Sequence, residues 1–239
     1  MAQRPELQIV RDVLAAVGPE ASTALFDALE RAGADPPGTR AEVVEIVRAH
    51  LAVALAARGV ARAPALIAEI LARIDASPAG PDDAVDVDVD LEDFEEGKTT
   101  QMTAVPHPVS VLVASVSESF AKRLLAVLGE DRVYPFTVAD ETALRHATFS
   151  AAPLVLVVDA TAPPAIDAGA MASAMRGLPR QTTPVVWSQD TDYGRALRSK
   201  LEQHHTQALF LSRTEGIEPL LDVVLSRRKQ SSSFPPPAY

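Results

Sequence analysis

The chain has 239 residues, of which 47% are apolar, so it is long enough to bury one or two sizeable cores. It has no cysteine, which excludes disulfides, zinc–thiolate sites and cysteine nucleophiles and is typical of a reducing cytoplasm. A formal net charge of −10 argues against nucleic acid as the main partner, and no apolar run approaches the roughly 20 residues of a membrane span.

Residues 1–76 are predicted to form a small all-α bundle of four short amphipathic helices, because apolar residues recur there at helical spacing. The start leads into a polar helix and not into an apolar signal segment. Gly18 and Pro19 separate the first two helices, and Thr39 with Glu42 predicts a capping box at the start of the third. We find no catalytic set here and expect a protein-binding or dimerising bundle. A DNA-binding helix-turn-helix is the weaker alternative.

Residues 77–108 are predicted to be a disordered linker, since nine acidic residues lie between positions 82 and 96 with almost no aromatics. Thr99, Thr100 and Thr103 follow the acidic run. They are either targets of a Ser/Thr kinase or plain linker threonines. Because the linker offers no apolar face, we expect the parts on either side to fold separately.

Residues 109–229 alternate five apolar runs with five helical segments, which predicts an α/β domain with a doubly wound five-stranded parallel sheet. The run from Leu154 to Asp159 lacks alternating polarity and predicts a strand buried on both faces. Its last residue, Asp159, would lie at the carboxyl edge, where open α/β sheets place their ligands. Residues 230–239 contain three consecutive prolines and predict a disordered tail.

Several motifs here follow the order of a known family. Residues 111–120 give a strand and a polar turn, and residues 154–159 with Pro163 give a strand, a terminal aspartate and a loop. Ser188 follows the fourth strand, and residues 210–213 carry an aromatic residue and then a cation. With its motifs in this order, the C-terminal half of the chain, and only that half, resembles the receiver domain of response regulators. The resemblance implies a receiver- or flavodoxin-like fold.

The resemblance also implies roles. Asp159 takes the position of the phosphorylated aspartate, whereas Ser188, Phe210 and Arg213 take receiver-switch-like positions, with Arg213 in place of a lysine. Phosphoryl transfer in receivers needs Mg²⁺, held in part by two acidic residues after the first strand. The matching positions here are serine and valine, at 115 and 116, and valine cannot be a metal ligand. We therefore expect a pseudo-receiver without a catalytic residue, metal or cofactor.

In this interpretation Asp159 caps the following loop and pairs with Arg213. We expect a bacterial, cytoplasmic, non-catalytic adaptor that binds protein partners in signal transduction, and we leave homodimerisation through either domain open. By the resemblance, Tyr193, Arg195 and Arg198 are candidate partner-binding residues. One alternative is a phosphorylation-dependent response regulator of a two-component system, with Asp159 as acceptor. Another is an enzyme that uses the carboxyl edge of the sheet.

Overall fold

The computed structural model of the chain describes residues 4–33, 37–77, 108–214 and 216–231. The predicted linker, with Thr99, Thr100 and Thr103, and the predicted tail from residue 232 lie outside the described residues. None of the helices in the described ranges is long and apolar enough to cross a membrane.

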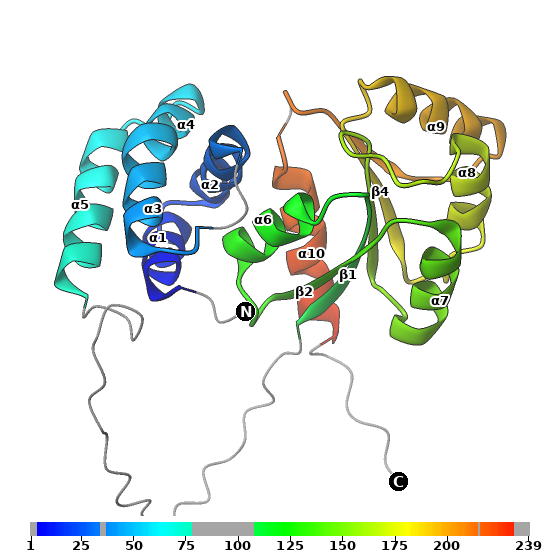
Figure 1. The fold of residues 1–239 in the computed structure, drawn as a ribbon, viewed down its shortest axis with the longest axis horizontal. Coiled ribbons are helices and arrows are strands. Elements are labelled where there is room, and N and C mark those ends of the chain that lie inside the picture. The colour runs from blue at the N-terminus through cyan, green and yellow to red at the C-terminus, as the bar shows by residue number, and fades with distance from the viewer. Residues whose placement is uncertain (1–3, 34–36, 78–107, 215, 232–239) are drawn as a thin grey trace, which may run out of the picture.

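A five-stranded, all-parallel sheet forms the centre of the C-terminal part (Figure 1). Its strand order is β2-β1-β3-β4-β5, as in flavodoxin-like folds, so the predicted α/β architecture is confirmed. The strands are β1 (Val109–Ala114), β2 (Val133–Val138), β3 (Val155–Asp159), β4 (Thr183–Trp187) and β5 (Leu209–Leu211). The helices that alternate with them are α6 (Ser119–Leu128), α7 (Glu141–Ala151), α8 (Ala168–Arg176), α9 (Asp192–Gln203) and α10 (Glu218–Ser231).

The strands divide their side chains between two cores. Val111 and Val113 of β1 point into a core that includes α6 and α10, whereas Leu112 and Ala114 belong to a core shared with α7, α8 and α9. Every residue of β3 is buried, as the continuous apolar run predicts. Parallel pairing sets Asp159 of β3 opposite Trp187 of β4, so both lie at the carboxyl edge of the sheet.

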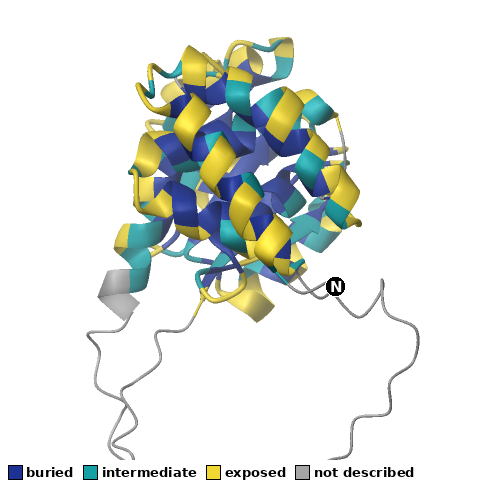
Figure 2. Cartoon of the chain, turned by 90° about the vertical axis from the view of Figure 1, so that its left-hand side faces the viewer, coloured by how far each residue is buried: buried dark blue, intermediate teal, exposed yellow. Residues whose placement is uncertain are grey.

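The N-terminal helices form an additional layer outside α6 and α10 (Figures 1 and 2). They are α1 (Pro5–Ala15), α2 (Pro19–Ala32), α3 (Arg40–Glu45), a π-helical turn η1 (Ile46–Leu51), α4 (Ala52–Ala57) and α5 (Ala63–Ala76). The predicted capping box of Thr39 and Glu42 is present. The predicted third helix is one continuous element of α3, η1 and α4, and its π turn was not predicted.

An aromatic cluster joins this helical layer to the sheet. Phe26 of α2 packs edge-on against Phe120 of α6 and Trp187 of β4, with ring centroids 5.5 and 5.8 Å away. All three rings are fully buried, and the buried apolar residues of α1–α5 form one continuous core with those of α6 and α10. The expectation of separate folding rested on the linker alone, whereas the apolar contact between the two parts is made by α2 and α6. Separate folding of the two parts stays a prediction from the sequence.

Polar contacts follow the same boundary. Arg58, which follows α4, donates to Asp27 of α2 at 2.8 Å and to Glu218 of α10 at 2.5 Å. Burial acts to lower the pKa of Arg58, but the hydrogen bonds and charges of the two carboxylates outweigh it and raise that pKa. Gly216, just before α10, has a left-handed φ of 86°, and a Cβ there would lie 2.5 Å from the Arg58 guanidinium. The positive φ thus favours glycine at position 216, and a side chain there would also push the Arg58 guanidinium aside.

Candidate functional site at the carboxyl edge of the sheet

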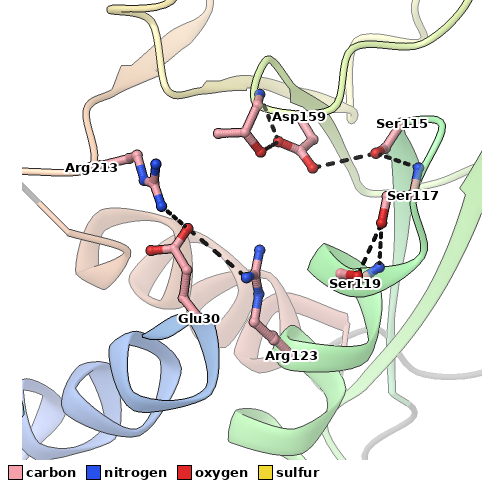
Figure 3. Close-up of polar contacts among 8 residues, drawn as sticks. Glu30, Ser115, Ser117, Ser119, Arg123, Asp159 and Arg213 are labelled. Atoms are coloured by element: carbon pink, nitrogen blue, oxygen red, sulfur yellow. Dashed lines mark hydrogen bonds and ion pairs between the residues drawn. The ribbon is translucent and has the colours of Figure 1, made fainter. Parts of the chain in front are cut away.

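Asp159 is the last residue of β3, and the residue as a whole is only 2% exposed. Its Oδ1 accepts hydrogen bonds from the backbone N–H of Thr161 at 3.0 Å and from the Thr161 hydroxyl at 2.5 Å. Its Oδ2 accepts a longer bond, 3.3 Å, from the hydroxyl of Ser115 (Figure 3). Asp159 therefore closes the loop that follows its own strand, in the manner of an Asx turn.

A row of serines continues this network along the β1–α6 turn. The Ser115 hydroxyl shares its single proton between Asp159 Oδ2 and the carbonyl oxygen of Ala162, which is the closer acceptor at 2.9 Å, and it accepts from the backbone N–H of Ser117 at 3.0 Å. The hydroxyl of Ser117 in turn donates to that of Ser119, the first residue of α6 (Figure 3). Ser115 thus connects the end of β1 to the segment after β3 by hydrogen bonds. Val116 beside it is exposed and offers no ligand atom.

Arg213 does not pair with Asp159, so that part of the expectation is wrong. Its Nη2 lies 2.9 Å from Oε1 of Glu30, in the last turn of α2 (Figure 3). The carboxylate of Glu30 reaches the site from the N-terminal helical layer, which the sequence expectation had treated as separate. The cation at the end of the fifth strand therefore belongs to the contact with α2.

Arg123 of α6 is a site residue that the sequence reasoning missed. Its guanidinium carbon lies 5.1 Å from the ring centroid of Phe26, and its Nη1 lies 3.9 Å from Oε1 of Glu30. Burial lowers the pKa of Arg123, while the charges of Glu30 and Asp159 act in the opposite direction. An available signal was its position: Arg123 interrupts the apolar face of a helix that carries Phe120 and Leu124.

Ser188 lies directly after β4 with a left-handed φ of 59°. The residue is fully buried, and its hydroxyl has no hydrogen-bond partner among the described residues. A buried hydroxyl without a partner and a non-glycine residue at positive φ both cost stability, and such features gather at functional sites. Ser188 thus combines a positive φ with a buried hydroxyl that has no partner among the described residues.

Phe210 of β5 is half-buried, and the guanidinium of Arg198 lies 5.1 Å above its ring. Arg198 also donates to Glu202 and Gln189. Arg195, on the same helix α9, is exposed and engages Asp192 and the carbonyl of Asp190. The structure thus brings Arg198 onto Phe210, whereas Arg195 lies one turn earlier on the same helix and Arg213 contacts α2.

Tyr193, the third candidate on α9, is half-buried. Its hydroxyl donates to the carbonyl oxygen of Ile166 at 2.9 Å, and its ring packs against the core on the α9 side of the sheet. Burial raises the pKa of Tyr193 to about 12, and the charge of Asp167 adds to the effect. These contacts give Tyr193 a role in holding α9 on the sheet.

Within the described residues, no group of three or more histidines, aspartates and glutamates is placed to hold a metal ion. Comparisons of the chain with protein-family models, with curated proteins and with solved structures give no match. The geometry of this edge offers a hydrogen-bonded carboxylate, a buried serine at positive φ and two arginines that face a carboxylate from α2.

Proposed function

We propose that the chain is a non-catalytic signalling adaptor, in which a pseudo-receiver α/β part and the helical layer bind protein partners. The observation that carries the proposal is the use of Asp159. Both of its oxygens accept hydrogen bonds from the loops of the same sheet edge, at Thr161 and Ser115. A phosphoacceptor needs an oxygen free for attack and a cation to offset charge on the transferring group. Here Oδ1 closes a loop through Thr161, and Oδ2 lies 3.3 Å from the hydroxyl of Ser115, with Val116 beside it in place of a metal-binding carboxylate.

The exposed cations of α9 support the binding role. Arg195 and Arg198 project from a helix that covers the sheet face opposite the helical layer, so a partner can reach them without displacing α1–α5 (Figure 1). Arginine is a frequent anchor of protein interfaces because its planar guanidinium makes several directed hydrogen bonds. We place the partner surface there.

The second candidate function is a phosphorylated regulator, and Ser188 is the observation that favours it. Ser188 follows β4, the strand next to β3, and its buried hydroxyl has no partner within the described ranges; a phosphoryl group on Asp159 would give it one. The two functions differ in two outcomes. The regulator requires that Asp159 gains a phosphoryl group and that this group changes partner capture, whereas the adaptor requires neither.

A single capture experiment tests both. Wild-type protein, Asp159→Asn and the double variant Arg195→Glu/Arg198→Glu are used as bait with source-cell extract, with and without acetyl phosphate and Mg²⁺. We expect no added phosphate by intact-mass measurement, equal capture by wild type and Asp159→Asn, and reduced capture by the double variant. A phosphate adduct that is lost in Asp159→Asn would overturn the adaptor in favour of the regulator. Undiminished capture by a folded double variant would remove the α9 surface.

A further inference from the structure

Two arginines from separate elements converge on one carboxylate oxygen at the boundary of the helical layer. Oε1 of Glu30 lies 2.9 Å from Arg213, which follows β5, and 3.9 Å from Arg123 of α6 (Figure 3). The side chains of Glu30 and Arg123 are 18% and 11% exposed, so two of the three charged side chains are largely shielded from solvent. Shielding strengthens the attraction between the charges.

Glu30 serves the two arginines unequally. The distance of 3.9 Å to Arg123 is too long for a hydrogen bond, and the buried Nε of Arg123 has no acceptor among the described residues. A carboxylate fixed to the end of α2 has only two oxygens. Those oxygens are also confined by the helix that carries them. Arg123 is therefore left with donor capacity that its present partner does not use.

We propose that Arg123 and Arg213 form an oxyanion-binding site for phosphate or a phosphoryl-bearing ligand, and that Glu30 is its replaceable internal ligand. A tetrahedral oxyanion offers more acceptor atoms than a carboxylate, and guanidinium groups bind phosphate oxygens in a bidentate manner. The charges agree with this assignment. Glu30 and Asp159 together balance the two arginines. Removal of the Glu30 charge leaves one positive charge uncompensated.

The competition has a structural consequence. Glu30 belongs to α2, and α2 carries Phe26 into the aromatic cluster, so an anion that takes Arg213 removes one of the polar contacts that hold the helical layer against α6. Binding of the anion and attachment of α2 are then linked, and each weakens the other. This assignment does not depend on the adaptor function.

Chemical rescue tests the proposal on the full chain. Glu30→Ala removes the internal ligand and leaves space for a free anion. Glu69→Ala is the matched control, because Glu69 forms an exposed pair with Arg73 on α5. Melting temperatures are compared in chloride and in inorganic phosphate at equal ionic strength. Phosphate stabilises folded proteins in general, so the readout is the difference between variants. Phosphate should raise the melting temperature of Glu30→Ala by about 2–4 °C more than that of wild type or Glu69→Ala.

Two further measurements fix the site. The extra gain should vanish in Glu30→Ala/Arg213→Gln, and the NMR signal of the Arg123 Nε–H should shift at lower phosphate concentration in Glu30→Ala than in the wild type, where Glu30 competes. If Glu30→Ala does not fold, Glu30→Gln takes its place in each comparison. The proposal is overturned if phosphate stabilises all variants equally, if the gain survives loss of Arg213, or if the Arg123 signal does not move.

Discussion

At the scale of single residues, charge and hydroxyl groups at the carboxyl edge serve mainly to hold loops and helices in place. Asp159 ties down its own loop through Thr161, and Tyr193 ties α9 to the segment before α8 through Ile166. The hydroxyl of Tyr193 donates to a specific acceptor and its pKa is raised, so its ionisation is linked to folding.

The first prediction is a loss of stability in alkali through Tyr193. Its pKa of about 12 lies above the value of about 10 for an unfolded tyrosine, so the folded state holds the proton more tightly. The resulting stability is fully present below about pH 10 and is lost as the pH rises from about 10 to about 12. The ultraviolet absorbance of tyrosinate should show one of the three tyrosines titrating late. In Tyr193→Phe this late phase should be missing. Three tyrosines that titrate together in the wild type would contradict the assignment.

At the scale of elements, α2 makes two sets of contacts within one continuous core. Its apolar residues pack among the other N-terminal helices, while Phe26 and Glu30 contact α6 and the loop after β5. The sequence pattern reveals the first role, because a helical spacing of apolar residues indicates a buried face. It does not reveal the second role. A phenylalanine on an amphipathic helix looks the same whether it packs on its own bundle or on a distant sheet.

The second prediction concerns the anchor that Phe26 provides. Phe26→Ala removes a fully buried ring from between Phe120 and Trp187 and should lower the free energy of unfolding by about 3–5 kcal/mol. Phe149→Ala is the matched control, since the ring of Phe149 on α7 is 88% exposed and its loss should cost less than about 0.5 kcal/mol. Urea unfolding measures both. Similar losses for the two variants would mean that the aromatic cluster does not hold the layers together.

The same limit separates what could be predicted at the site from what could not. The positions of the strands along the chain follow from apolar runs, and the location of Asp159 at the sheet edge follows from the end of one such run. The partner of Arg213 could not be found in this way. Glu30 lies in a different part of the chain, at the end of a helix, with no motif around it. The burial of Arg123 likewise depends on α2, which covers it.

At the scale of the whole molecule, the described residues form consecutive layers: the N-terminal helices, then α6 with α10, then the sheet, then α7 to α9 (Figure 1). One core runs from the first layer to the sheet, and only the second core is confined to the α/β part. A continuous core predicts that these layers unfold together. The parts on either side of residues 77–108 are therefore expected to unfold in one transition, although the linker separates them in sequence.

The third prediction follows for a cleaved chain. A site-specific protease sequence inserted after Asp90 allows the chain to be cut between the helical layer and β1. We expect the two fragments to co-elute on size exclusion under native conditions and to melt in one transition, because Phe26 and Arg58 still join them. Cleaved Phe26→Ala should separate more readily. Independent elution of the wild-type fragments would show that the contact is too weak to act without the covalent connection.

The π turn at Ile46–Leu51 has a consequence for the same boundary. One extra residue in a helical turn changes the rotational phase of everything that follows by about 100°. Arg58 lies after that turn, so the direction in which its side chain points, toward Asp27 and Glu218, depends on the added residue. A strictly α-helical version of the segment, one residue shorter, would preserve the composition and length of the helix almost unchanged. It would nevertheless turn the Arg58 guanidinium away from α10, so that one backbone irregularity inside the helical layer sets the alignment of a charge at its boundary with α10.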